Sequence, residues 1–413
     1  MEAVCSESAG PDRPEPVLLT APADGVPPVV DSAEALRSAA DVLASGTGPV
    51  AVDTERASGY RYSQRAYLLQ VRREGAGTVL VDPIPLAGEL DPLVEALGGT
   101  EWVLHAASQD LPCLEELGLR PQRLFDTELA GRLAGFDRVS LGALCERMLG
   151  YQLEKGHGAA DWSRRPLPED WLVYAALDVE LLVDLRAAMH AELRRQGKLD
   201  WAHEEFAAAR TAEPPAPRAE PWRRTSGIHR VRSPRKLAAV RALWQARDAV
   251  ARQRDIAPGR VLPDSSIVQA ATSGPTTEAE LTKLPVFGGK QQRRRASTWL
   301  EALHSAQRLS SDELPGPASS QDGPPPTNRW SDRDPAAAAR LTAARAVVNE
   351  LAEEHDVPAE NLLLPDLLRR TCWSPPEQRD VEGVRAHLRA GGAREWQIGL
   401  TAEPLTAALR AEA

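Results

Sequence analysis

The sequence has no apolar run approaching the roughly 20 residues that a membrane-spanning helix needs. Its first residues, MEAVCSESAGPDRPEP, are acidic and polar and lack the charged-then-apolar order of a secretory signal. The four cysteines lie far apart and form no CxxC pair, which excludes the usual cysteine-rich zinc site and gives no disulfide framework. We therefore expect a protein of the reducing cytoplasm with no membrane partner.

Positive charge is scarce overall but concentrated in one region. The net charge is −10, yet residues 228–305 carry 14 Lys and Arg against 6 Asp and Glu, a net of about +8. The remainder of the chain is therefore negative by about 18. An acidic body joined to a basic module suits a metal-binding protein with a separate phosphate-gripping part, although a solvated charged face would give the same pattern.

Three proline-rich stretches divide the 413 residues. The first is a polar tail at residues 1–30, which is expected to be disordered, and the others are expected linkers at 211–232 and 309–334. A chain of this length exceeds what one hydrophobic core usually serves. We therefore expect three folded bodies, the first, second and third, at residues 31–210, 233–308 and 335–413.

The first body alternates strand and helix patterns. Short apolar runs with β-branched residues predict strands at 49–55, 67–71, 79–82 and 101–106. Residues 168–195 carry Leu, Val and Ala at helical spacing. Because three strands follow one another before helices intervene, the pattern indicates an α/β domain with a mixed sheet rather than a purely parallel one.

The second and third bodies have all-helical patterns and share a faint internal repeat. Asp255-Ile-Ala-Pro-Gly-Arg-Val-Leu-Pro-Asp resembles Asp356-Val-Pro-Ala-Glu-Asn-Leu-Leu-Leu-Pro-Asp. Each segment follows an Ala-rich amphipathic helix, at 237–254 and 336–355. The similarity is short, but its matching placement in two helical bodies favours a duplication.

Four carboxylates and a tyrosine occupy strand ends and a helix face of the first body. Asp53 and Glu55 are two apart on a predicted strand, so both side chains leave the same face. Asp110 follows the last predicted strand, in the first turn of a helix. Tyr174 and Asp178 are four apart on a helix and stack one turn apart. Each feature alone also fits an ordinary structural role, such as a solvent-facing strand end or a packed tyrosine.

Together the four carboxylates are candidates to converge at one edge of the sheet. Carboxylates about 4 Å apart repel by roughly 4 kcal/mol per pair at an effective dielectric constant near 20, so several stay ionised together only with divalent cations. Oxygen ligands with no cysteine and at most one histidine nearby favour Mg²⁺ or Mn²⁺ over zinc. Two such ions about 3.5–4 Å apart form a clamp suited to phosphodiester cleavage.

Five ordered segments then match a known family. They are VDTE (52–55), HAASQDL (105–111), FDTELAGRL (125–133), DWSRRPL (161–167) and YAALDVELL (174–182). In order and spacing they resemble the DEDD 3′–5′ exonucleases, specifically the ribonuclease D branch with a motif tyrosine. The resemblance covers most of residues 48–196 and implies a ribonuclease-H-like fold.

The resemblance also implies roles for individual residues. Asp53, Glu55, Asp110 and Asp178 correspond to the metal-binding carboxylates, and Tyr174 corresponds to the residue that orients the attacking water. The implied reaction uses two divalent cations, Mg²⁺ or Mn²⁺, and releases nucleoside 5′-monophosphates from a 3′ end. In the family the segment that contains Asp126 is structural, so this residue is left out of the metal set.

Contacts to substrate are matched less closely. The segment after Glu55 keeps the aromatic residue and the final Gln of the family, so candidate contacts to the terminal nucleotide are Tyr67 and Gln70. His105 is added to them, although a histidine at a strand end is often a satisfied hydrogen-bonding residue. Lys155 and Arg165 are candidate phosphate contacts, although exposed charges of this kind are often only solvated.

The second body resembles the helicase-and-ribonuclease-D C-terminal (HRDC) domain. The resemblance rests on Leu284-Pro-Val-Phe-Gly-Gly-Lys290 and the helix that follows. The Gly-rich turn is expected to offer backbone N–H groups to phosphate, and positive charge is added by Lys290, Arg293, Arg294 and Arg295. The third body resembles a degraded copy that lacks the arginine cluster, and it is expected to serve packing or substrate reach more than binding.

The implied substrate is an RNA 3′ end, such as a tRNA precursor or another structured RNA. A 3′–5′ DNA exonuclease is an alternative, because the chemistry is common to both nucleic acids and discrimination depends on contacts to the 2′-OH. The absence of a P-loop or helicase motor from the sequence favours RNA. An inactive scaffold is a further alternative, and a pure binding protein would leave the acidic cluster unexplained. No protein partner can be inferred.

Overall fold

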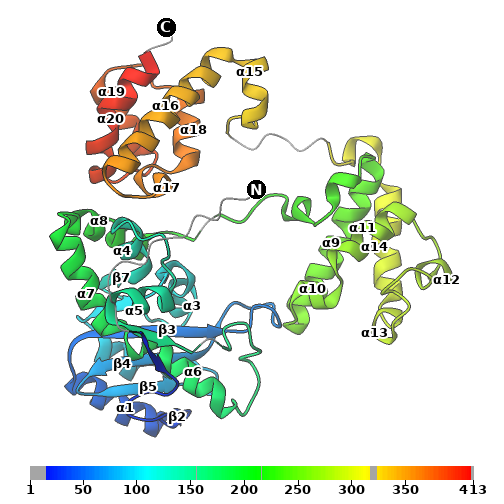
Figure 1. Cartoon of the computed structure of the whole chain (residues 1–413). Helices are drawn as coiled ribbons and strands as arrows, with labels where there is room; N and C mark the ends of the chain where they lie inside the picture. Colours follow the sequence, from blue (N-terminus) through cyan, green and yellow to red (C-terminus); the bar gives the residue numbers. More distant parts are fainter. Residues whose placement is uncertain (1–14, 155, 215, 317–322, 411–413) are drawn as a thin grey trace, which may run out of the picture.

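The computed structural model describes residues 15–154, 156–214, 216–316 and 323–410 (Figure 1). The first body contains a six-stranded sheet in the order β2-β5-β4-β3-β6-β7. These strands are β2 (Val29–Val30), β3 (Thr47–Arg56), β4 (Ala66–Glu74), β5 (Gly77–Val81), β6 (Glu101–Leu104) and β7 (Arg123–Asp126). The β3–β4 and β4–β5 pairs are antiparallel, whereas the β3–β6, β6–β7 and β2–β5 pairs are parallel. The predicted mixed α/β sheet is confirmed.

Alternation along β3 sorts its side chains between two hydrophobic layers. Val50 and Val52 are buried on one face, in a core formed with α1 (Ala33–Ser45), α2 (Asp91–Leu97) and α3 (Leu111–Glu116). Ala51 is buried on the opposite face, which packs against α4 (Thr127–Leu133), α5 (Leu141–Leu149), α6 (Glu169–Glu180), α7 (Leu182–Arg195) and α8 (Leu199–Thr211). Since side chains alternate, Asp53 and Glu55 share the face of Ala51 and meet α6.

The segment before the sheet differs from the expected disordered tail. Residues 1–14 lie outside the described residues, but Val17–Leu19 forms β1, which pairs in parallel with β8 (Tyr151–Leu153). β2 lies in the same stretch and joins the main sheet. These two short apolar segments therefore form strands with partners far along the chain, despite the surrounding prolines.

The second and third bodies are helical, as expected. The second contains α9 (Pro234–Arg254), α10 (Pro258–Val261), α11 (Asp264–Ser273), α12 (Glu278–Leu281), α13 (Lys290–Arg293) and α14 (Ala296–Arg308). The third contains α15 (Trp330–Arg333), α16 (Pro335–Glu354), α17 (Ala359–Leu362), α18 (Pro365–Trp373), α19 (Val381–Ala390) and α20 (Glu395–Arg410). Figure 1 shows the second body beside the first and the third body against α4 and α8. No helix of the described residues is both long and apolar enough to cross a membrane.

The expected linkers contain short helical turns and buried tryptophans. In the linker at 211–232, 3₁₀ turns form at Pro221–Arg224 and Ile228–Arg230, and Trp222 is buried in the core of the second body. In the linker at 309–334, 3₁₀ turns at Ser311–Glu313 and Thr327–Arg329 precede α15, and Trp330 is buried in the core of the third body. Burial of these indole rings attaches parts of the proline-rich segments to the helical bodies.

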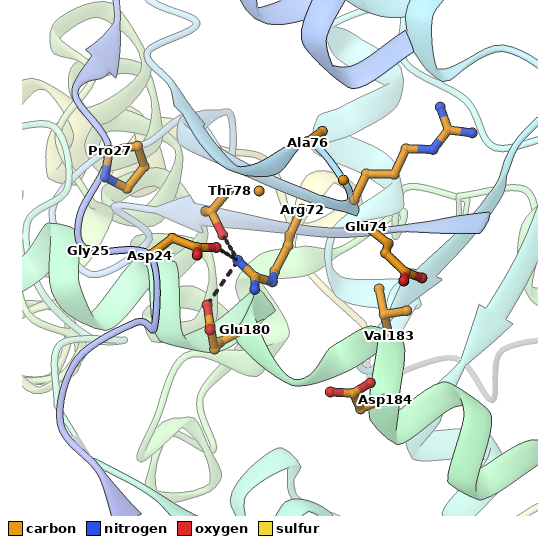
Figure 2. A pocket seen from close by; sticks show the side chains of 13 residues that line it. Asp24, Gly25, Pro27, Arg72, Glu74, Ala76, Thr78, Glu180, Val183 and Asp184 are labelled. Carbon is orange, nitrogen blue, oxygen red and sulfur yellow. Dashed lines mark hydrogen bonds and ion pairs between the residues drawn. The ribbon is translucent and has the colours of Figure 1, made fainter. Parts of the chain in front are cut away.

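A buried polar network fixes the C-terminal end of α6. The predicted helix over 168–195 is divided at Leu181, and Glu180 ends α6 with 8% of its surface exposed. Figure 2 shows Arg72 of β4 between Glu180, Asp24 and Thr78. Arg72 Nη1 lies 3.2 Å from Glu180 Oε2 and donates to Thr78 Oγ1 at 2.8 Å. Glu180 Oε1 accepts from the Ala23 N–H at 3.1 Å, so four segments meet at this helix end.

Arg72→Met is expected to destabilise the protein by about 3–5 kcal/mol, because it leaves Glu180 buried without its counter-charge. The double variant Arg72→Met/Glu180→Gln is expected to recover most of this loss, since no buried charge remains unpaired. Urea unfolding followed by circular dichroism measures both. A double variant as unstable as Arg72→Met would show that the network does not act through the Glu180 charge.

Candidate active site

The four predicted carboxylates and Tyr174 line one cavity of about 440 Å³. Oxygen atoms of Asp53, Glu55 and Asp178 lie within 4.8 Å of one another. The first two extend from the C-terminal end of β3, and Asp178 extends from α6, one turn after Tyr174. Asp110 enters from the junction between the 3₁₀ turn Ala107–Gln109 and α3. The structure thus brings together the residues that the motifs selected.

Asp110 is held by β3 itself. The hydroxyl of Thr54, which lies between Asp53 and Glu55, donates to Asp110 Oδ1 at 2.6 Å. Arg56 Nη2 lies 4.0 Å from the same oxygen, and its side chain is 26% exposed. Neither residue was among those predicted from the sequence. Their position next to the two carboxylates on β3 was the available signal, and both residues line the same cavity.

Burial and mutual repulsion shift the pKa values of the carboxylates upward. Burial, and then the charges of Asp110 and Asp178, raise the pKa of Asp53 well above its usual range. Burial, and then the charge of Asp53, raise the pKa of Glu55 to about 10. Burial raises the pKa of Asp178 to about 7 and that of Asp110 to about 6, against hydrogen bonds from Tyr174 and Thr54 respectively. Such a site has too little positive charge to offset its carboxylates.

This donor set fits a hard divalent cation. The ligand atoms are carboxylate oxygens from three or four side chains, which is the chemistry that Mg²⁺ and Mn²⁺ prefer. Among the described residues that line the cavity, Arg56 is the one permanently positive side chain, and it does not neutralise the cluster. A bound cation would offset the repulsion that the raised pKa values record.

A glycine-flanked loop packs on Tyr174. The Tyr174 ring meets the His157 ring edge-on, with centroids 6.0 Å apart. A Cβ added to Gly158 would lie 3.3 Å from Tyr174 Oη, so a larger residue would crowd the phenol. His157 Nε2 lies 3.3 Å from Asp170 Oδ2, which ties the loop to the start of α6. Lys155, a predicted phosphate contact in this loop, lies outside the described residues.

His105 lines the same cavity. Its Nδ1 lies 2.9 Å from Thr127 Oγ1, and burial lowers the pKa of the imidazole to about 4, so the ring is neutral at pH 7. The turn after His105 is held by Asp126, which accepts from the N–H groups of Ala106 and Ala107 at 3.1 and 2.8 Å and also caps α4. Asp126 thus holds the backbone that follows His105 without lining the cavity itself.

Three predicted substrate contacts lie outside the residues that line the cavity. Arg165 Nε and Nη2 donate to the two oxygens of Asp82 at 2.6 and 2.8 Å, so this guanidinium is engaged within the first body. Tyr67 is 3% exposed, and its carbonyl also accepts from Arg165 at 2.7 Å. Gln70 is fully buried opposite Asp53, and neither amide atom has a hydrogen-bond partner among the described residues.

The predicted basic cluster lies in another body. Lys290 and Arg293 bound α13, and with Arg294 they are exposed, whereas Arg295 is partly buried. The structure therefore separates the acidic cavity of the first body from the basic cluster of the second. The substrate-contact assignments, at both places, stay predictions.

Family models match all three bodies. A model of the 3′–5′ exonuclease matches residues 27–194, a model of the HRDC domain matches residues 236–303, and a model of the 3′ to 5′ exonuclease C-terminal domain matches residues 323–409. Because the carboxylate cavity lies in the first of these segments, the fold and the site define a 3′–5′ exonuclease. The third body matches a model of its own, so its interpretation as a second HRDC copy stays a prediction.

Curated relatives identify the family. Ribonuclease D of Acidiphilium cryptum is 32% identical over 390 residues, which are 92% of this chain and 92% of that protein. Ribonuclease D of Gluconacetobacter diazotrophicus is 30% identical over 345 residues, 81% of this chain and 84% of that protein. The chain belongs to the ribonuclease D family, and the predicted resemblance is confirmed.

Solved structures extend the similarity over all three bodies. A protein from Bifidobacterium adolescentis is 40% identical, with a TM-score of 0.88, and the match covers 96% of this chain and 100% of that one. Escherichia coli RNase D, described as an exoribonuclease involved in structured RNA processing, is 25% identical, with a TM-score of 0.64. That match covers 88% of this chain and 96% of the E. coli chain.

Asp178→Asn is expected to stabilise the metal-free protein at pH 8 by roughly 1–3 kcal/mol relative to wild type. The folded-state pKa of Asp178 is raised from 3.8 to about 7. Stability from the protonated carboxyl is therefore fully present below pH 3.8 and lost as the pH rises through about 7. Unfolding in EDTA at pH 5 and pH 8 should show the larger advantage at pH 8. A stability gain that is equal at pH 5 and pH 8 would contradict the raised pKa of Asp178.

Proposed function

We propose that this chain removes nucleotides one at a time from RNA 3′ ends, using two divalent cations, Mg²⁺ or Mn²⁺, held by Asp53, Glu55, Asp110 and Asp178. The observation that carries the proposal is the set of buried and partly buried carboxylates around one cavity, three of them within 4.8 Å of one another. An inactive scaffold would have no use for such a costly cluster.

The choice of RNA is supported by the relatives. The curated relatives are named ribonuclease D, and the E. coli structure carries a description of structured RNA processing. We extend both to this chain and propose structured RNAs with 3′ extensions, such as tRNA precursors, as substrates. The products are nucleoside 5′-monophosphates.

The residues that line the cavity have different roles in the proposed reaction. Bound divalent cations would stabilise the charge that develops on the attacking and leaving oxygens of the phosphodiester. Burial, and then the charge of Asp178, raise the pKa of Tyr174, so its phenol keeps its proton. Tyr174 therefore orients a water molecule by hydrogen bonding instead of removing its proton. Neutral His105 contacts the terminal nucleotide from the cavity wall.

The second body supplies a sequence-independent grip on phosphate. Lys290, Arg293 and Arg294 present a cluster of exposed positive charge in the basic part of the chain. Contacts of this kind release counterions, so affinity falls as salt rises. The long 3′ arm of a structured RNA is the kind of ligand that reaches from this cluster to the cavity.

Degradation of end-labelled oligonucleotides tests the reaction. With Mg²⁺ or Mn²⁺, single-stranded RNA labelled at its 5′ end should be shortened stepwise, and EDTA or Asp53→Ala should abolish the ladder because the cation site is lost. Tyr174→Phe should slow turnover by about 10²–10⁴-fold, the usual size of such contributions, while binding of Mn²⁺ is retained.

The matching DNA oligonucleotide is the control for substrate class. Faster degradation of DNA than of RNA would keep the exonuclease chemistry and overturn the RNA assignment. Binding of both without degradation of either would support the inactive scaffold instead.

Salt dependence tests the basic cluster. Arg293→Glu/Arg294→Glu should weaken RNA binding and reduce the slope of log K against log[salt] by about 0.7 for each phosphate of the single strand that the variant no longer neutralises. Arg333→Glu/Arg345→Glu, which reverses two exposed charges of the third body, is the matched control and should change the slope less. Equal slopes in the two variants would assign the effect to net charge.

A further inference from the structure

The repeated segments of the two helical bodies form the same turn. α9 is followed by Asp255 with φ of +48°, and α16 is followed, after His355, by Asp356 with φ of +49°. A short helix follows each, α10 or α17, and then a longer one, α11 or α18. Left-handed backbone is uncommon for residues other than glycine, although Asp tolerates it. Both turns lie against the first body. The proposed reaction does not explain this placement.

The turn at Asp356 docks the third body on a structural region. Lys198 is 6% exposed, and its Nζ donates to the carbonyls of Leu133 and Asp356 at 2.8 and 3.0 Å. The two bodies also share one apolar core, in which the rings of Trp201 and Trp396 stack with centroids 4.9 Å apart. A shared apolar core therefore attaches the third body, in addition to the contacts of its turn.

The turn at Asp255 docks the second body on the loop at residues 57–65. Asp255 Oδ1 accepts from the N–H groups of Tyr62 and Ser63 at 3.1 and 2.8 Å. Its Oδ2 lies 3.6 Å from Arg65 Nη2 and accepts from the Tyr67 hydroxyl at 3.4 Å. One carboxylate of the second body thus binds both the middle and the end of this loop.

Neighbouring residues of the same turn add further contacts. The N–H of Ala257 donates to the Tyr60 carbonyl at 2.9 Å. Arg260 Nε donates to the Gly59 carbonyl at 2.8 Å, and its guanidinium lies 3.9 Å from the centre of the Tyr60 ring. Tyr62 packs against the core of the second body, and its hydroxyl donates to Asp248 at 3.1 Å.

This loop connects directly to the carboxylate cavity. It leaves β3 after Arg56, which lines the cavity beside Glu55, and it returns to β4 at Ala66. Arg56 and Ala66 pair across a register irregularity, and Glu55 pairs with Leu68. A change in the shape of the loop is therefore transmitted to the end of β3, which carries Glu55 and Arg56.

We infer that Asp255 is a positioning residue for the exonuclease reaction: the second body uses this carboxylate to hold the loop at residues 57–65 in the shape that admits the nucleic-acid 3′ end to the cavity. The inference rests on the proposed function for the identity of the substrate, but not for the contact itself. It assigns the second body a role beyond its grip on phosphate.

The test removes the carboxylate without disturbing the turn. Glycine adopts a φ of +48° at no steric cost, so Asp255→Gly deletes the side chain and keeps the backbone. Asp356→Gly makes the same change in the third body and is the matched control. Asp255→Asn keeps an acceptor oxygen for the two loop N–H groups and is the conservative rescue variant.

Hydrogen–deuterium exchange and steady-state kinetics on the full chain provide the two readouts. In Asp255→Gly the Tyr62 and Ser63 amides should exchange at least ~10-fold faster, because they lose their acceptor. KM for single-stranded RNA should rise by about 10-fold with a smaller change in kcat, and Mn²⁺ affinity should stay at the wild-type value. Asp356→Gly should leave loop exchange and KM unchanged, and Asp255→Asn should fall near wild type.

Three results would overturn the inference. Unchanged loop exchange in Asp255→Gly would show that the carboxylate does not hold the loop. Faster exchange with unchanged KM and kcat would show that the loop does not serve the site. Equal kinetic losses in both glycine variants would indicate a general effect of loosening a helical body. If the wild type degraded DNA instead of RNA, the proposed substrate would fail, and the same comparison on DNA would still decide the role of Asp255.

Discussion

Repulsion among buried carboxylates is the constraint on which this structure depends. Asp53, Glu55 and Asp178 place oxygens within 4.8 Å of one another, and their pKa values are raised by burial and by each other. The surrounding fold must hold them there against that cost. β3 does so as one of the two middle strands of a sheet covered on both faces, and α6 does so through the Arg72–Glu180 pair at its C-terminal end.

Two charged groups of the first body, Arg165 and Asp126, hold the chain around the site. Arg165 pairs with Asp82, and Asp126 accepts backbone N–H groups of the turn that leads from His105 towards Asp110. The Thr54 hydroxyl of β3 donates a hydrogen bond to Asp110. As a result, Arg56 is the one Lys or Arg among the described residues that line the cavity, and in the proposed reaction bound cations and the second body would supply the counter-charge for phosphate. The proposed reaction thus gives a reason for the separation of the acidic first body from the basic second body.

The two helical bodies are attached by different forces although their turns are alike. The third body continues the apolar core of the first, so its position is set by burial of side chains such as Trp396 and Phe206. The second body has a core of its own and meets the first through polar contacts around Asp255. Polar contacts at a partly exposed interface contribute less to stability than a shared core. The second body is therefore held mainly by polar contacts, and Asp255 makes several of them.

The sequence by itself determined the features that depend on local chain geometry. Alternation along β3 put Asp53 and Glu55 on one face, the four-residue spacing on α6 put Tyr174 beside Asp178, and the ordered motifs identified the exonuclease fold. Only the tertiary structure decided which partners the long side chains take. Arg165, expected at phosphate, binds Asp82, Gln70 is fully buried, and Val17–Leu19 forms a strand with residues more than a hundred positions away. Backbone periodicity is fixed by the residues themselves, whereas the partner of an arginine, an amide or an edge strand depends on what folding brings within reach.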